Sequence, residues 1–114
     1  MPYPPVTALI PAYNAKRTIG RALASVWHQN YPDMEVIVVD DGSSDGTGSE
    51  VHKMHRGNLR LIRLEKNRGE CGAMNAGIHQ ARTDYIAFLD ANNDGVFDST
   101  DLGQFRARFN LNVF

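Results

Sequence analysis

Residues 36–46 read VIVVDDGSSDG, and this stretch decides the fold. It opens with an unbroken run of β-branched side chains, which is typical of a strand covered on both faces in a parallel sheet. Two carboxylates and a glycine-containing loop follow directly, so the chain is expected to leave the sheet at a polar turn. The stretch therefore predicts a buried strand over about residues 35–40, with Asp40 and Asp41 at its end.

Strand patterns and helix patterns alternate on both sides of this strand. Three further apolar runs of strand length lie at residues 6–10, 59–64 and 85–89. Apolar residues at helical spacing predict helices over about 18–29 and 71–81. Ser44 or Asp45 can cap a third, short helix that runs to about Met54. The sequence thus predicts an α/β fold with right-handed crossovers, a mostly parallel sheet of about four strands and flanking helices.

Length and composition indicate a compact chain with little net charge. The chain has 114 residues, of which 42% are hydrophobic, so it can bury a core. Twelve Lys and Arg oppose thirteen Asp and Glu, and this balance disfavours nucleic acid as a partner. No apolar run approaches the ~20 residues of a membrane span, and the first residues lack the pattern of a signal peptide. With Cys71 as the sole cysteine, we expect a cytoplasmic protein without a transmembrane segment.

Polar motifs follow the predicted strands at their carboxyl ends. They are residues 11–14, 40–43, 67–69 and Asp90. In an open parallel sheet, ligands bind beyond the carboxyl ends of the strands, where helix N-termini offer amide donors. We therefore expect these loops to converge on one crevice.

In this order, the motifs resemble those of family 2 glycosyltransferases. The matching stretches are IPAYN at 10–14, VVDDGSSD at 38–45, NRG at 67–69 with Ala73, Asn75 and Gly77, and FLD at 88–90. The resemblance covers roughly residues 4–92 and points to the N-terminal, nucleotide-sugar-binding half of the family's domain. It implies a Rossmann-like GT-A half-domain and a glycosyltransferase of the hexosyltransferase type. The expected donor is a nucleotide diphosphate sugar, specifically a UDP-sugar.

The resemblance also implies a nucleotide-binding site. Its residues are Pro11, Ala12, Tyr13, Asp40, Asp41, Gly42, Arg68, Gly69 and Asp90. Tyr13 and Asp41 belong in the base pocket, where an aromatic face can stack on uracil and a carboxylate can accept the ring N–H. Asp40 is expected on the ribose side and Arg68 at a phosphate. Gly69 lets the backbone pass close to the ligand.

Some of these residues also have a plainer interpretation. Tyr13 and Asn14 fit a capped helix start. Asp40 and Asp41 fit a solvated strand end. Asn75 and Gly77 are interpreted as helix packing positions rather than ligand contacts.

Asp90 stands where the family carries its metal motif, an Asp-x-Asp whose carboxylates hold a divalent ion beside the diphosphate. Here the motif reads Asp90-Ala91-Asn92, and Asn92 offers a carbonyl oxygen without a charge. The resemblance implies Mn²⁺ or Mg²⁺ bound with the nucleotide sugar. The family's catalytic base and acceptor site lie further along the chain, so we expect a domain truncated before its acceptor half, with catalytic residues and acceptor unknown.

Residues 90–101 also fit a calcium-binding loop. Oxygen ligands occupy the expected loop positions, and Gly95 stands at the sharp turn. The Ca²⁺ ligands are Asp90, Asn92, Asp94, Val96 through its backbone carbonyl, Asp98 and Asp101. With a helix predicted from Leu102, residues 90–114 resemble one dockerin-type, EF-hand-like repeat, although dockerins normally carry two. A solvated turn that binds nothing is the plainer alternative.

The two resemblances divide the chain into residues 1–89 and 90–114, with Asp90 in both motifs. A natural fusion, a truncated or frameshifted gene and an engineered chimera all fit this overlap. The leading hypothesis is a nucleotide-sugar-binding transferase domain, and the alternative is a non-catalytic calcium-binding or assembly module. A different nucleotide-binding α/β protein is disfavoured because no glycine-rich fingerprint follows the first strand. Half a sheet exposes strand edges, so we also expect a homo-oligomer.

Overall fold

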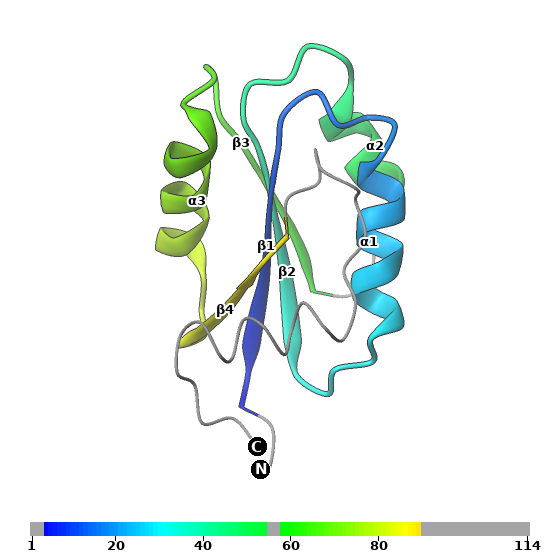
Figure 1. Cartoon of the computed structure of the whole chain (residues 1–114), viewed down its shortest axis with the longest axis vertical. Coiled ribbons are helices and arrows are strands. Elements are labelled where there is room, and N and C mark those ends of the chain that lie inside the picture. Colours follow the sequence, from blue (N-terminus) through cyan, green and yellow to red (C-terminus); the bar gives the residue numbers. More distant parts are fainter. Residues whose placement is uncertain (1–3, 55–57, 90–114) are drawn as a thin grey trace.

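A computed structural model describes residues 4–54 and 58–89, in which strands and helices alternate (Figure 1). In chain order the elements are β1 (Val6–Ala12), α1 (Ile19–His28), β2 (Met34–Asp40), α2 (Thr47–Lys53), β3 (Leu59–Arg63), α3 (Gly69–Gln80) and β4 (Tyr85–Phe88). All elements predicted within these ranges are present. The N-cap of α2 is Gly46 rather than the predicted Ser44 or Asp45, and Asp45 instead accepts the N–H of Thr47 from the position before the cap. α3 begins at Gly69 rather than at Cys71, because its exposed first turn carries no apolar periodicity that could mark the start.

The strands form one parallel sheet in the order β3-β2-β1-β4. The pairing of β1 with β2 runs from Val6↔Met34 to Ala12↔Asp40, so both strands end at the same edge of the sheet. The chain adds β2 and then β3 on one side of β1, and it crosses back to add β4 on the other side. The strand order therefore reverses between β1 and β4, the position at which open α/β sheets bind ligands. The predicted α/β fold with a parallel sheet is confirmed.

Helices cover both faces of the sheet. α1 and α2 lie on one face and α3 lies on the other (Figure 1). Because side chains alternate along a strand, Ala8 and Ile10 join the cluster beneath α1, whereas Leu9 joins the cluster beneath α3. Every residue of β1 is buried, which explains why its sequence is apolar without alternation.

α3 approaches the sheet closely at Gly77. A Cβ atom at this position would collide with the side chain of Leu9 on β1, so the glycine permits the approach. Gly77 is buried, as is Ala73 one turn earlier. The interpretation of Gly77 as a packing position is therefore confirmed. Asn75 lies on the exposed side of α3, so its interpretation as a packing position is wrong.

The amino ends of the strands are tied together by Glu35 of β2. Its carboxylate accepts hydrogen bonds from Thr7 Oγ1 (2.6 Å), Arg60 Nη2 (3.0 Å) and the backbone N–H of Arg82 (2.8 Å). Thr7 Oγ1 also lies 2.7 Å from Thr83 Oγ1. Burial raises the pKa of Glu35, but the hydrogen bonds from Arg82, Thr7 and Arg60 outweigh burial and hold the pKa below its ordinary value. We call these five residues the amino-end cluster.

The structure leaves several sequence predictions untested. The predicted calcium loop and the helix from Leu102 lie outside the described residues. None of the helices in residues 4–54 and 58–89 is long and apolar enough to span a membrane. β3 and β4 are the edge strands of the described sheet, and self-association through such an edge stays a prediction.

Candidate functional site

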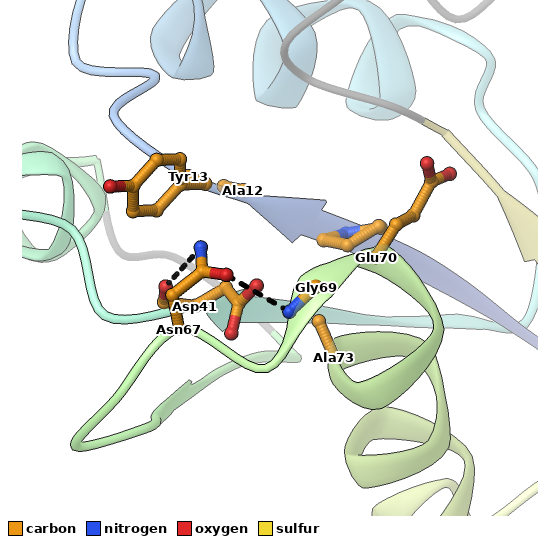
Figure 2. A pocket seen from close by; sticks show the side chains of 8 residues that line it. Ala12, Tyr13, Asp41, Asn67, Gly69, Glu70 and Ala73 are labelled. Atoms are coloured by element: carbon orange, nitrogen blue, oxygen red, sulfur yellow. Dashed lines mark hydrogen bonds between the residues drawn. The ribbon is translucent and has the colours of Figure 1, made fainter.

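A cavity of about 200 Å³ lies beyond the carboxyl ends of β1 and β2, against the first turn of α3 (Figure 2). It is lined by Pro11, Ala12, Tyr13, Asp41, Asn67, Gly69, Glu70 and Ala73. Five of these, namely Pro11, Ala12, Tyr13, Asp41 and Gly69, belong to the nucleotide-binding set predicted from the sequence. The carboxyl ends of the strands and the start of α3 therefore meet at one site.

The pleat of the strands decides which polar residues reach this cavity. Ala12 and Asp40 are paired in the sheet, and Ala12 packs in the cluster beneath α1. Tyr13 and Asp41 directly follow the two strands. Each therefore turns toward the α3 face, and both line the cavity. Two neighbouring aspartates thus point to opposite sides of the sheet.

Asp41 is held in place by the loop that leads into α3. Its Oδ1 accepts a hydrogen bond from the backbone N–H of Arg68 (2.7 Å), and its backbone carbonyl accepts one from Asn67 Nδ2 (3.2 Å). Its own N–H donates to the carbonyl of Ala12 (2.8 Å). No donor in the described part of the chain bonds the second carboxylate oxygen, Oδ2. The buried carboxylate therefore presents a preoriented acceptor.

Asp40 supports the loops instead of lining the cavity. Its Oδ1 accepts a hydrogen bond from the backbone N–H of Ser43 (3.0 Å), and its Oδ2 lies 3.7 Å from Arg63 Nε. The same oxygen lies against Gly48 in α2, on the face opposite the cavity. Asp40 and Asp41 are only 2% and 3% exposed, so the interpretation of this pair as a solvated strand end is wrong. The ribose-side role of Asp40 stays a prediction that this geometry does not support.

Tyr13 forms the wall of the cavity opposite Asp41 and Asn67 (Figure 2). Tyr13 is 43% exposed and lines the cavity, so part of the residue is open to a ligand. The following residue, Asn14, does not cap α1, whose N-cap is Thr18. Asn14 hydrogen bonds to the β2–α2 loop instead, and the interpretation of residues 13–14 as a helix cap is therefore wrong.

The remaining residues of the predicted set have distinct placements. Gly42 has a φ of 75°, and a Cβ there would lie 2.7 Å from the backbone nitrogen of Asn67. It therefore permits two loops to touch, and it does not line the cavity. Gly69 has a φ of 79° and open space where a Cβ would be. Arg68 contributes its backbone N–H to Asp41, whereas its exposed side chain is not part of the lining.

The sequence interpretation did not assign three lining residues. Asn67 and Ala73 were part of the recognised motifs but had no role. Asn67 joins the loops, since its Oδ1 also accepts the N–H of Gly69 (3.1 Å). Glu70 brings a second carboxylate to the cavity from the exposed first turn of α3, directed away from Asp41 (Figure 2). Its position directly after Gly69, at a predicted helix start, was the available signal.

The predicted metal ligands are outside the part of the chain that the structure describes. They are Asp90, Asn92, Asp94, Val96, Asp98 and Asp101. Among residues 4–54 and 58–89, no group of three or more His, Cys, Asp or Glu side chains could hold a metal ion. Both metal predictions therefore stay predictions.

The chemistry of the cavity suits a planar ring with a hydrogen-bond donor at its edge. Tyr13 offers an aromatic face for stacking, and Asp41 offers a charged acceptor. The volume of about 200 Å³ is below the ~300–1,000 Å³ of pockets that enclose a whole drug-sized ligand. A larger ligand would therefore extend out of the cavity across the ends of the strands.

Comparisons with known proteins agree with this geometry. The sequence model of a family described as Glycosyl transferase family 2 matches residues 7–111. The succinoglycan biosynthesis protein ExoO of Rhizobium meliloti (strain 1021) is 46% identical over 90 residues, which are 79% of this chain and 26% of that protein. The matched family range extends past residue 89, where the sequence places a domain boundary.

Solved structures share the fold. The mannosyltransferase PcManGT from Pyrobaculum calidifontis, in complex with GDP-Man and Mn²⁺, superposes with a TM-score of 0.81 and 29% identity. The match covers 96% of this chain and 33% of that one. Residues 1–349 of S. aureus TarS, in complex with UDP-GlcNAc, give 0.73 and 28% over 93% of this chain and 31% of that one. The predicted Rossmann-like GT-A fold is confirmed, and this chain spans about a third or less of the proteins it matches.

Proposed function

We propose that this chain, which belongs to glycosyl transferase family 2, binds the nucleotide of a UDP-sugar in the cavity between Tyr13 and Asp41. Its relatives and structural neighbours include a mannosyltransferase, and the chain is a transferase domain by that family membership. One observation carries the proposal: a buried aspartate, whose Oδ2 is bonded by no donor within residues 4–54 and 58–89, shares one cavity with an accessible aromatic ring.

The base would be recognised by two complementary contacts. Uracil presents a planar face, which can stack on Tyr13, and a ring N–H, which Asp41 can accept. Arg68 and Asn67 donate hydrogen bonds to Asp41 in the free protein. The carboxylate therefore needs little reordering when the ligand arrives. Low reordering favours affinity.

The sugar diphosphate would extend from the cavity toward the reversal of strand order between β1 and β4. The first turn of α3 borders that path, and a helix N-terminus favours phosphate. Glu70 opposes the phosphates there, so a divalent cation such as Mn²⁺ or Mg²⁺ would offset like charge. Asp90 and Asn92 are the proposed ligands of that ion.

The whole transfer reaction needs more than this site. The chain spans 26% of ExoO, and the acceptor region of the family lies beyond the matched motifs. We propose that this site binds the donor, and that transfer also requires residues that position the acceptor, since positioning both reactants supplies much of the catalysis.

Calorimetric titration with UDP, with and without Mn²⁺, Mg²⁺ or Ca²⁺, tests the proposal. Asp41→Ala should weaken binding about tenfold or more, because a charge-assisted hydrogen bond contributes ~1.5–3 kcal/mol. Asp41→Asn should weaken it similarly while keeping an acceptor for Arg68. The matched control is Asp84→Ala, which removes an exposed aspartate before β4 and should leave affinity unchanged. Equal affinity in the parent and both Asp41 variants would refute the base-pocket assignment.

A second candidate function, calcium binding by residues 90–101, is favoured by the spacing of the six proposed ligands. On this proposal the chain is a calcium-binding or assembly module, with or without nucleotide binding. Ca²⁺ should raise the melting temperature by an amount that grows with its concentration. Asp94→Ala should abolish that increase and leave UDP affinity unchanged. Absence of a thermal shift in the parent protein would exclude the calcium site.

A further inference from the structure

The loop that carries Tyr13 is fastened to the β2–α2 loop by a series of hydrogen bonds. Three consecutive backbone N–H groups, those of residues 14, 15 and 16, each donate to a side-chain oxygen of that second loop or of Thr47, the first residue of α2. The acceptors are Ser43 Oγ (2.8 Å), Thr47 Oγ1 (2.9 Å) and Asp45 Oδ2 (3.1 Å), in that order. We call these contacts the loop clasp.

Asn14 both donates and accepts hydrogen bonds in the loop clasp. Besides donating its N–H, it accepts the backbone N–H of Ser44 (2.9 Å) and the Ser44 hydroxyl (3.4 Å) at Oδ1. Its φ is 50°, a left-handed conformation that asparagine adopts more readily than most residues. The residue type therefore suits both the backbone turn and the side-chain contact.

Asp45 strengthens the same clasp. Its Oδ1 accepts the backbone N–H (3.0 Å) and the hydroxyl (2.5 Å) of Thr47. Burial raises the pKa of Asp45, but the hydrogen bonds from Thr47 and from the Lys16 amide outweigh burial and hold the pKa below its ordinary value. Asp45 therefore stays charged at neutral pH and keeps Thr47 aimed at the loop of Asn14.

The clasp fixes the backbone on the far side of Tyr13. On the near side, Ala12 is paired with Asp40 in the sheet, and its carbonyl accepts the N–H of Asp41. The two backbone anchors therefore set the position from which the side chain of Tyr13, a residue that is 43% exposed, faces the cavity.

We propose that Asn14 is a positioning residue that holds the Tyr13 ring against the cavity in the free protein, so that the ring is set for stacking before a base arrives. This proposal rests on the nucleotide-binding function given above. The alternative is that the clasp serves only to start α1, in which case Asn14 would affect stability without any special link to Tyr13.

The first test is made without ligand. Nuclear magnetic resonance couplings of Tyr13 should report a single χ1 rotamer in the parent protein and in Asn14→Asp, which keeps the Oδ1 acceptor. Asn14→Ala should average the rotamers, because it removes the acceptor and disfavours the left-handed backbone. Asn14→Gly keeps the backbone but loses the acceptor, and should lie between the two. A single unchanged rotamer in Asn14→Ala would overturn the positioning role.

The second test uses UDP binding and a double-mutant cycle. Asn14→Ala should weaken UDP binding about threefold to tenfold, corresponding to ~0.7–1.4 kcal/mol, and Asn14→Asp should retain most of the affinity. In a Tyr13→Ala background, Asn14→Ala should cause no further loss. Equal losses in both backgrounds would show that Asn14 does not act through Tyr13. If the parent protein binds no UDP while the rotamer result holds, the nucleotide function fails and the positioning role stands.

Discussion

The two ends of the sheet use carboxylates of low solvent exposure in opposite ways. At the amino end, Glu35 accepts hydrogen bonds from Thr7, Arg60 and the N–H of Arg82. At the carboxyl end, Asp41 accepts one backbone N–H at Oδ1 and lines a cavity. A carboxylate whose acceptors are filled by its own chain ties the fold together, whereas one that keeps an oxygen toward a cavity is available to a ligand.

The comparison predicts its largest effect for Glu35→Ala. Removing this carboxylate takes away the ion-pair partner of Arg60. Arg60 Nη2 then keeps the carbonyl of Gln80 as an acceptor, and its Nε already has no hydrogen-bond partner within the described residues. We expect a loss of about 3 kcal/mol or more in the free energy of unfolding, measured by urea denaturation. UDP affinity of the folded protein should not change.

The matched control for this variant is Glu65→Ala, which removes an exposed glutamate of the β3–α3 loop and should leave stability within about 0.5 kcal/mol. If Glu35→Ala weakens UDP binding while stability is kept, the assignment of a purely structural role to the amino end is wrong.

A smaller effect is expected for Asp40→Asn, which sharpens the comparison to two adjacent residues. Asn keeps an acceptor for the N–H of Ser43 but loses the charge beside Arg63. Because the Arg63 side chain is 60% exposed, that ion pair contributes little, and we expect about 1 kcal/mol lower stability. UDP affinity should fall less than threefold, in contrast to Asp41→Asn. Equal losses of UDP affinity in Asp40→Asn and Asp41→Asn would show that Asp40 contributes to the binding site.

The smallest predicted effect is a change in how the free energy of unfolding falls at acidic pH. In the folded chain the pKa of Glu35 lies below its ordinary value of 4.5. Its charged form therefore stabilises the fold above pH 4.5, and this contribution is lost as the pH falls through the lower folded pKa. Glu35→Gln should be less stable than the parent at neutral pH and lose less on acidification. Urea midpoints at about pH 6 and about pH 3.5 measure the difference, and parallel losses would contradict it.

The sequence predicted the elements and the half of the site that depends on local pattern. The strands and the helices α1 and α3 were visible as apolar patterns, whereas α2 was predicted from possible cap residues. The motif order brought Tyr13, Asp41 and Gly69 to one cavity. The interpretation grouped Asp40 with Asp41 because they are adjacent in a motif. The alternation of side chains along β2 sends them to opposite faces, and applying it to the motif would have separated them.

Other features depend on contacts that no local pattern contains. The residues of the amino-end cluster come together only through the register of the sheet and the loop before β4. They are Thr7, Glu35, Arg60, Arg82 and Thr83. Likewise, Arg68 anchors Asp41 through its backbone N–H rather than its charged side chain. A backbone donor has no sequence signature, so the sequence interpretation assigned a role to the guanidinium group.

Chemical-shift mapping of backbone amides during a UDP titration tests the central claim most directly, since it compares the two ends of the sheet in one experiment. We predict the largest shifts at Tyr13, Asp41 and residues 67–70, and shifts within error at Thr7, Glu35 and their neighbours in the amino-end cluster. Shifts centred on the amino-end cluster, or no shifts at residues 12–13, 41 and 67–70 at saturating UDP, would contradict the account.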